Sequence, residues 1–506
     1  MRLKATLVKN AASNLLRGGT TAVVNLALPH FLIKTLDVDR FSAWSLMLQI
    51  AAYASFFDFG LQTAVGRFVA HCTELGQLER RKKLIETSYC AFLIVAALAM
   101  IVIGVVTFVG NHIFKGLPPQ LLHEFRMAGI ILGFGAALQL TFSPFTGVLV
   151  GLHRNELPAI ATIVSRLGGA FAVILLARHT HSLIVLASAI AVANLLAGAI
   201  QYLAVIYYLP AMRRMHMRID SGILHELFRF CMALGVLTLS MFVIQGLDVT
   251  IIGRFQFSQV GYYTIAASVI GMISGLSGAI LTSLTAPFAV LQARGDASRI
   301  ATSMLDVTWG TSLANGALIL LFVLWSQAIL SLWVGGFYAT LAGPILVVLL
   351  FAQAIRLMAS PLSTALIACG LHGKAVVSSI AEALVNLLLS VYLVQRVGAI
   401  GVAYGTLAGA VISILLHLLY TLPKTPTVPV RPKDLLYSGL ALPLLALSPL
   451  ILYALTRAHY VVNHSYLALS ASFALMPLTA IWSWKIQRAR RSSVMAYRVS
   501  PSISYD

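Results

Sequence analysis

The sequence predicts an all-α integral membrane protein with about fourteen transmembrane helices. Hydrophobic residues make up 59% of the 506 residues and charged residues only 10%, against roughly 25% charged residues in soluble domains. The apolar runs are continuous, whereas the strands of a membrane barrel would alternate apolar and polar residues. A helix satisfies its own backbone hydrogen bonds within lipid, so helices are expected here.

Each run of about 20 mostly apolar residues is long enough to cross a bilayer. A window of about 19 residues moved along the chain gives the candidate helices. Their predicted limits are 14–36, 41–66, 84–110, 124–150, 155–177, 182–209, 223–252, 259–291, 302–332, 340–369, 374–396, 398–422, 434–456 and 465–487. No segment between them is long enough for a soluble domain, and the chain has no glycine-rich phosphate-binding loop ending in Gly-Lys-Ser or Gly-Lys-Thr. We therefore expect neither ATP hydrolysis nor a bound cofactor.

The sequence contains an internal repeat. Gly151-Leu152-His153 recurs as Gly370-Leu371-His372 at an offset of 219, and Ser143-Pro144 recurs as Ser360-Pro361 at an offset of 217. A weaker match pairs residues 33–45 with residues 252–264. Matches at nearly the same offset indicate that a six-helix unit was duplicated. The two copies would then form two lobes that face each other across an axis along the membrane normal. The predicted division is an N-lobe at 1–209, a C-lobe at 210–422, two further helices at 434–487 and a basic tail at 488–506.

Basic residues alternate between the loops and so predict the orientation of the chain. The loops of one side carry Arg2, Lys4, Lys9, Arg80, Arg81, Lys82, Lys83, Arg154, Arg213, Arg214, Arg218, Arg294, Arg299, Lys374, Lys424, Arg431, Lys433, Arg488, Arg490, Arg491 and Arg498. This asymmetry puts both termini in the cytoplasm. The net charge of +19 then lies at anionic lipid headgroups, and we expect membrane lipids rather than nucleic acid as partners. The scattered cysteines and histidines show no metal-ligand spacing, so no metal site is expected.

Arginines within the predicted spans are the main candidates for substrate binding. Arg166 and Arg356 fall near the middle of the fifth and tenth spans, and Arg17 and Arg229 lie toward the cytoplasmic ends of the first and seventh. A guanidinium stays protonated, and its planar fork fits phosphate oxygens. A cavity with more arginine than carboxylate would hold an anion such as a diphosphate. The alternatives are a structural pair with an acid for Arg166 and Arg356, and snorkelling to the headgroups for Arg17 and Arg229.

Acidic residues within the spans are candidates for coupling to H+ or Na+, or for counterions of nearby arginines. They are Asp58 in the second span, Asp248 in the seventh and Glu382 in the eleventh. A buried carboxyl group is able to take a proton near neutral pH.

Prolines and glycines within the spans are candidates for hinges. Pro144 and Pro361 occupy matching positions in the two repeats, where each removes a backbone hydrogen bond. Gly271 and Gly275 in the eighth span are further hinge candidates, although small residues also allow close helix packing.

Short motifs resemble those of polysaccharide flippases. In the second span they are Phe57-Asp58-Phe59-Gly60-Leu61 and Arg67-Phe68-Val69; across the seventh and eighth they are Asp248, Ile252-Gly253-Arg254-Phe255, Val260-Gly261-Tyr262-Tyr263 and Ala266. With the predicted spans and the repeat, the chain resembles the multidrug/oligosaccharidyl-lipid/polysaccharide (MOP) exporter superfamily, in its Wzx-like O-antigen flippase branch.

The resemblance implies a flippase that moves an undecaprenyl-diphosphate-linked oligosaccharide, a repeat unit of O-antigen, capsule or exopolysaccharide, across the bacterial inner membrane. It also implies a cationic central cavity, to which Arg17, Arg166 and Arg356 would contribute, and contacts with polysaccharide synthesis enzymes are a further expectation. One alternative is a cation-coupled multidrug efflux antiporter of the same superfamily, although the first span lacks the carboxylate cluster of many such antiporters. Another alternative is an intramembrane polysaccharide polymerase or ligase, although the chain lacks a large extracytoplasmic loop for an acceptor site.

Overall fold

The computed structural model describes residues 2–425, 428–459 and 465–496. Within these ranges the chain is helical and contains no strand, as the composition predicts. The first half consists of α1 (Arg2–Thr35), α2 (Val38–Ala52), η1 (Tyr53–Asp58), α3 (Leu61–Glu74), α4 (Leu78–Phe108), α5 (Gly110–Ile113), η2 (Pro119–Leu121), α6 (Leu122–Gly151), α7 (Glu156–His179), α8 (Leu183–Tyr208) and η3 (Pro210–Arg214).

The second half continues in the same helical manner and ends with α18. Its elements are α9 (Ser221–Met241), η4 (Phe242–Gly246), α10 (Asp248–Phe255), η5 (Phe257–Gln259), α11 (Val260–Ala293), α12 (Ala297–Val334), α13 (Gly336–Ala368), η6 (His372–Ala375), α14 (Val376–Val397), α15 (Ala399–Leu416), η7 (His417–Thr421), α16 (Pro432–Leu436), η8 (Tyr437–Ala441), α17 (Leu442–His459) and α18 (Ser465–Ala496). Three of the short elements, η4, η7 and η8, are π-helical turns.

Ten helices of the described chain are long and apolar enough to cross a membrane, and a pair bent by 50°, Ser221–Met232 and Leu234–Gly246, would make an eleventh. The predicted spans at 14–36, 41–66 and 465–487 coincide with α1, with α2 and α3, and with α18, which are not among the ten. The all-α membrane fold is therefore confirmed, whereas the number of fourteen crossings stays a prediction. Because α18 continues to Ala496, the first part of the predicted basic tail is helical; residues 497–506 lie outside the described residues.

Two predicted spans are interrupted in the structure. The span predicted at 41–66 ends its first part at Asp58 and restarts at Leu61, because Phe59 and Gly60 adopt left-handed conformations with φ of 47° and 80°. A Cβ on Gly60 would lie 2.8 Å from Cβ of Leu234, so glycine serves both the turn and the close approach of α9. The span predicted at 223–252 passes through the π-turn η4 before α10 begins. A hydropathy average over 19 residues does not detect either interruption.

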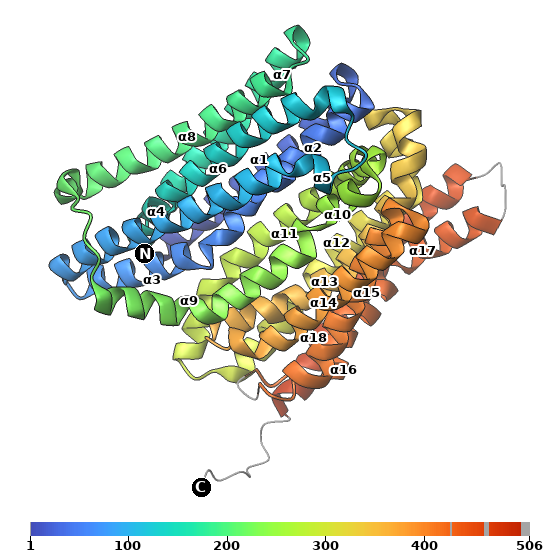
Figure 1. Ribbon diagram of the computed structural model, residues 1–506. Coiled ribbons are helices and arrows are strands. Elements are labelled where there is room, and N and C mark those ends of the chain that lie inside the picture. The colour runs from blue at the N-terminus through green and yellow to red at the C-terminus, as the bar shows by residue number, and fades with distance from the viewer. Residues whose placement is uncertain (1, 426–427, 460–464, 497–506) are drawn as a thin grey trace.

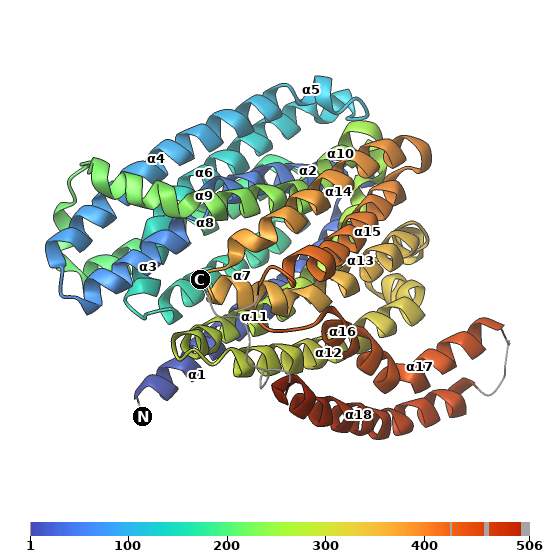
Figure 2. The same ribbon diagram turned by 90° about the horizontal axis from the view of Figure 1, so that it is seen from below.

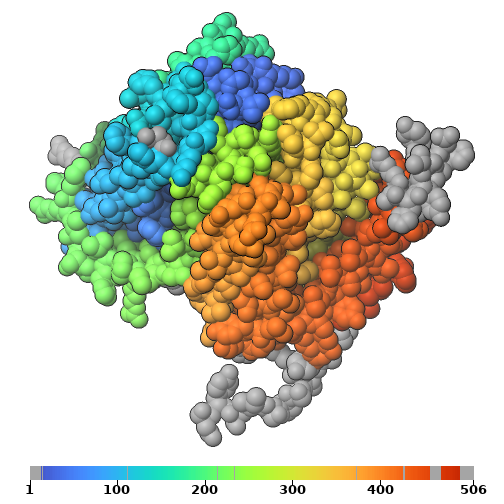
Figure 3. Space-filling model, turned by 45° about the vertical axis from the view of Figure 1, so that its right-hand side comes forward, coloured from blue at the N-terminus to red at the C-terminus, as the bar shows by residue number. Residues whose placement is uncertain are grey.

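The helices pack into two groups that meet along α11. In Figures 1 and 2, α1–α8 lie together and α12–α15 lie on the other side of α11, with α17 and α18 against the outside of α12. The space-filling view shows the green surface of α9–α11 between the blue-to-cyan and orange surfaces (Figure 3). The lobe boundaries at 209 and 422 stay a prediction. One contact is consistent with the repeat offset: the Gly261 N–H donates to Ser42 Oγ at 3.2 Å, and these residues are 219 positions apart. Residues at the repeat offset touch only near an axis that relates the two copies.

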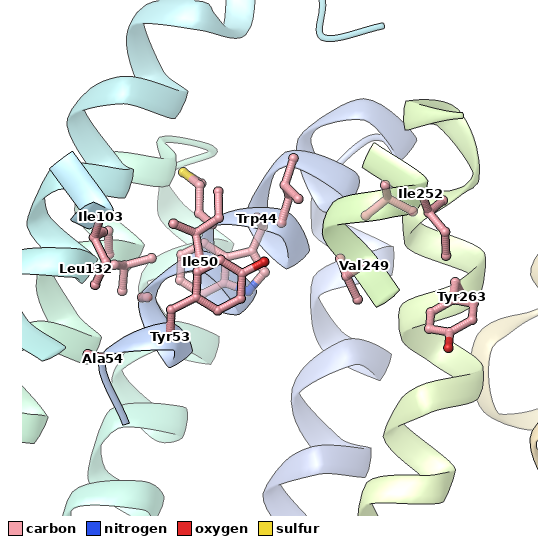
Figure 4. Packing of buried hydrophobic residues seen from close by; sticks show 14 of the residues in the cluster. Trp44, Ile50, Tyr53, Ala54, Ile103, Leu132, Val249, Ile252 and Tyr263 are labelled. Carbon is pink, nitrogen blue, oxygen red and sulfur yellow. The ribbon is translucent and has the colours of Figure 1, made fainter. Parts of the chain in front are cut away.

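A continuous apolar core joins the two groups. Figure 4 shows Trp44, Ile50 and Tyr53 of α2 and η1 between the segments that carry Ile103 and Leu132 and those that carry Val249, Ile252 and Tyr263. Polar contacts cross the same region: Tyr53 bonds to Thr250, and Gln49 Nε2 donates to the Gly246 carbonyl at 2.9 Å. The core therefore holds the first and second halves of the chain in contact around the ends of α2 and α10.

Candidate substrate-binding cavities

The cavity that we call the Arg166 cavity has a volume of about 330 Å³ and lies among α1, α2, α6, α7, α8 and α11. Its walls are mainly apolar and carry a few neutral polar side chains. These polar residues are Asn25, Ser45, Ser165, Asn194, Thr264 and Ser268. Arg166 projects from the middle of α7 and is the single charged residue among the described residues of the lining.

Arg166 has no hydrogen bond or ion pair with any described part of the chain, and its side chain is exposed. A charge at membrane depth is costly unless it meets a partner or a hydrated cavity. Because no described wall residue is a carboxylate, the positive charge of this cavity is left for a ligand to balance.

The cavity that we call the Arg356 cavity is larger, at about 610 Å³, and lies among α9, η4, α11, α13, α14, α15 and η7. Arg356 Nε donates to Glu382 Oε1 at 2.7 Å, and the two side chains are 18% and 10% exposed. Arg356 therefore forms a pair with an acid, which is the structural alternative to substrate binding. The described lining of the Arg166 cavity contains no acid. Arg356 Nη2 is buried and has no hydrogen-bond partner within the described chain.

His417 is a member of the Arg356 cavity that the sequence analysis missed. It begins the π-turn η7, is 5% exposed, and lines the cavity together with Glu382. Its Nε2 lies 3.3 Å from Ser378 Oγ, while its Nδ1 is buried and has no partner among the described residues. The sequence offers one signal for this residue, a lone histidine inside the apolar run at 398–422. In the structure this histidine begins a π-turn, and π-turns are frequent at functional sites.

The two cavities share one wall, α11. Thr264 and Ser268 of α11 line the Arg166 cavity, while Ser274, Thr282 and Thr285 of the same helix line the Arg356 cavity. This helix is continuous from Val260 to Ala293, so the two sites have one helix in common.

The structure does not bring the other two candidate arginines to these cavities. Arg17 is exposed near the middle of α1 and lines neither one. Arg229 lines a separate hollow of about 440 Å³ with His225, Glu226 and Phe68, between α9 and α3. Arg17 and Arg229 therefore lie outside both cavities in this conformation, and their role in substrate binding stays a prediction.

The candidate acids occupy three different environments. Asp58 Oδ1 accepts a hydrogen bond from the Gln62 N–H at 2.9 Å and so caps the start of α3. Asp248 is buried at the start of α10, where Oδ2 accepts from Tyr263 at 2.6 Å and from Thr406 at 3.4 Å. Of the three, Glu382 lines the Arg356 cavity, and the other two line neither of the two cavities. Their role in ion coupling stays a prediction.

The hinge candidates lie within continuous helices. Pro144 is inside α6 and Pro361 inside α13, and both are buried. Gly271 and Gly275 face α1: an added Cβ would lie 3.2 Å from Asn25 Nδ2 at the first and 3.8 Å from the Gly18 carbonyl at the second. These glycines therefore stand in the close-packed position that small residues allow, and hinge motion at any of the four stays a prediction. The described residues contain no group of three or more potential metal ligands.

A family model described as polysaccharide biosynthesis protein matches residues 7–289, which is more than half of the chain. The chain belongs to this family. The matched part includes every residue that lines the Arg166 cavity, whereas Arg356, Glu382 and His417 lie beyond it. No curated protein sequence gives a significant match.

Solved structures show which fold this polysaccharide biosynthesis protein has. It is similar to the lipid II flippase MurJ in an inward closed conformation, with a TM-score of 0.65, 14% identity and 98% of each chain covered. It is also similar to the eukaryotic MATE transporter AtDTX14, with a TM-score of 0.64, 14% identity, and 87% of this chain and 98% of that chain covered. A MOP superfamily transporter from Pyrococcus furiosus gives a TM-score of 0.60 at 14% identity, with 84% and 96% covered. The fold that the resemblance to the MOP superfamily predicts is thus confirmed, and the protein is a multi-pass membrane protein with a transporter fold.

Proposed function

We propose that this protein is a flippase that carries an undecaprenyl-diphosphate-linked oligosaccharide from the cytoplasmic to the periplasmic leaflet of the bacterial inner membrane by alternating access. The observation that carries the proposal is the unpaired Arg166 in a cavity whose described lining has no carboxylate. Membership of a polysaccharide biosynthesis family supports a carbohydrate substrate, and the likeness to a lipid II flippase supports a lipid-linked one. Both termini would then lie in the cytoplasm, near the synthesis enzymes that supply the substrate.

The chemistry of Arg166 fits the diphosphate of such a lipid. The guanidinium donates to two phosphate oxygens at once. No carboxylate in the described lining competes with the phosphate for these donors. The sugar would cross in the polar interior, and the polyprenyl chain would remain in the surrounding lipid.

Complementation of a deletion strain tests this proposal. Arg166→Ala should slow transport about tenfold or more, since a hydrogen bond to a charged group contributes about 1.5–3 kcal/mol. Lipid-linked sugar should therefore accumulate and surface polysaccharide should fall. Arg166→Lys keeps the charge but loses the fork, and we expect an intermediate result. Arg178→Ala, at the end of the same helix and outside the cavity, is the matched control and should behave as wild type.

Arg356→Ala and Arg356→Lys belong in the same series, because Arg356 is the second arginine that lines a cavity. Protein levels in the membrane are measured for every variant. Unchanged surface polysaccharide in the deletion strain, without build-up of lipid-linked precursor, would exclude the flippase.

The second candidate function is cation-coupled export of drugs, which the likeness to MATE transporters favours. It predicts that deletion increases sensitivity to cationic compounds while surface polysaccharide stays normal. We propose Glu382 as the first residue to examine for coupling to H+ or Na+, ahead of Asp58 and Asp248, because it lines one of the two cavities and they line neither. If transport by Glu382→Gln in vesicles responds to imposed proton and sodium gradients as wild type does, Glu382 is not the coupling residue.

A further inference from the structure

The Arg356 cavity differs from a simple anion site because its fixed charge is already balanced. Arg356 and Glu382 are the charged pair in its described lining, and they bond to each other at 2.7 Å. The guanidinium uses Nε for this bond and leaves Nη2 buried without a partner in the described chain. The pair leaves little net positive charge in this cavity, and Nη2 remains an N–H donor for which the described chain supplies no partner.

His417 offers the opposite hydrogen-bonding group. Ser378 Oγ donates its single proton to the Ala375 carbonyl at 2.8 Å, so the bond with His417 at 3.3 Å has Nε2–H as its donor. In the neutral ring, Nδ1 is then an acceptor. It is buried without a partner among the described residues, and such a group costs about 1–3 kcal/mol unless something bonds to it.

Hydroxyl groups add further acceptors to the wall. Ser360 and Thr364 of α13 donate at 2.9 Å to the carbonyls of Arg356 and Ser360, and Thr282 of α11 donates to the Gly278 carbonyl. Each proton is directed back along its own helix, so each oxygen keeps a lone pair for a ligand. Gln245 and Gln353 contribute amide groups to the same lining.

A fitting ligand must accept a hydrogen bond from Arg356 and also donate to His417 and to the hydroxyl oxygens. An ionised diphosphate only accepts, whereas each sugar hydroxyl both donates and accepts. We propose that the Arg356 cavity binds the neutral sugar part of the transported lipid, while the Arg166 cavity holds its diphosphate. This inference rests on the proposed function and assigns the two chemical parts of the substrate to two sites.

The spacing of the cavities along α11 fits such a division. Ser268 lines one cavity and Ser274 the other; six residues correspond to about 9 Å of helix, which a sugar attached to a diphosphate spans. The Arg356 cavity, at about 610 Å³, is also the larger of the two, as the bulkier sugar portion requires.

Native mass spectrometry of the full-length protein with two lipids tests the assignment. One probe is undecaprenyl diphosphate, and the other is the lipid-linked oligosaccharide extracted from the deletion strain that accumulates it. His417→Phe and Gln353→Met should each weaken binding of the sugar-bearing lipid about tenfold and leave binding of undecaprenyl diphosphate unchanged. Arg166→Ala should weaken binding of both lipids by a similar factor.

Gln201→Met is the matched control. Gln201 and Gln353 are 4% and 5% exposed, and each bonds to one hydroxyl group. Gln353 lines the Arg356 cavity, whereas Gln201 lines neither of the two cavities. The control should bind both lipids as wild type does. If His417→Phe and Gln353→Met weaken binding of both lipids alike, or weaken binding of neither lipid, the assignment is wrong. Wild-type protein that binds both lipids equally well also overturns it while leaving the flippase intact; wild-type protein that binds neither lipid overturns the flippase and the assignment together.

Discussion

The Arg166 and Arg356 cavities each receive an arginine from the middle of a helix, but only Arg356 has an acidic partner. In the Arg356 cavity the pair with Glu382 at 2.7 Å cancels the charge, while hydroxyl, amide and imidazole groups supply the polarity. In the Arg166 cavity the charge stays unbalanced, and the other polar groups of the lining are neutral. Under the proposed assignment, the pairing of the arginines, rather than their number, decides which part of the substrate each cavity attracts.

This distinction has an electrostatic basis. In a medium of low dielectric constant, a nearby opposite charge offsets several kcal/mol of attraction toward any further ion. Arg356 therefore acts mainly as a positioned hydrogen-bond donor, whereas Arg166 keeps its full attraction for an anion.

Removal of Glu382 should give the largest effect, on stability. Glu382→Ala leaves Arg356 buried without its counterion, which typically costs about 3–5 kcal/mol. The free energy of unfolding, measured by titration with sodium dodecyl sulfate, should fall by about that amount. The double variant Arg356→Met/Glu382→Leu should recover most of the loss, because it removes both charges. A fall of less than about 1 kcal/mol for the single variant would show that the two cavities do not differ in pairing.

Placing a carboxylate in the Arg166 cavity should make it resemble the other one. Asn194→Asp adds an acid to the same lining as Arg166 and should weaken binding of undecaprenyl diphosphate about tenfold, which corresponds to about 1.4 kcal/mol. Native mass spectrometry measures the change. Asn194→Ala removes the amide without adding charge, so its effect should be clearly smaller. Equal losses in the two variants would contradict the electrostatic explanation.

The smallest expected effect compares two hydroxyl groups on α11. Thr264 and Thr282 each donate to the carbonyl four residues earlier, but Thr264 lines the Arg166 cavity and Thr282 the Arg356 cavity. Valine at either position removes one hydrogen-bond acceptor, and the lost hydrogen bond contributes about 0.5–1 kcal/mol to binding. Thr282→Val should weaken only the sugar-bearing lipid, about threefold, and Thr264→Val should weaken both lipids to a similar small extent. Reversed selectivity in the same binding assay would exchange the roles of the two cavities.

Most of the fold was predictable because lipid imposes long apolar helices that a hydropathy average detects. The averages gave the positions of α4, α6–α8 and α11–α15 closely. They could not detect the left-handed turn at Phe59 and Gly60, because two residues barely change the mean over a window. Nor did they show that α2 and α3 are separate helices of 15 and 14 residues, each too short to cross a bilayer alone.

The site was only half predictable. The sequence identified Arg166 and Arg356 as charges at membrane depth, and it left open whether each one binds substrate or pairs with an acid. The answer depends on the rotation of α13 and α14 about their axes, which brings Arg356 to Glu382, and one sequence does not encode that rotation visibly. His417 was missed because a single histidine in an apolar run forms no motif; its importance comes from Ser378, 39 positions away.

The shared wall formed by α11 has a thermodynamic consequence. A ligand that favours one position of α11 in the first cavity also changes the shape of the second, so occupancy of the two sites is linked. Linkage of this kind is reciprocal: if diphosphate binding raises the affinity for sugar by some factor, sugar binding raises the affinity for diphosphate by the same factor. A complete substrate would then stabilise a single position of the helix more strongly than either half alone, so that partial substrates would be poor triggers of the transport cycle.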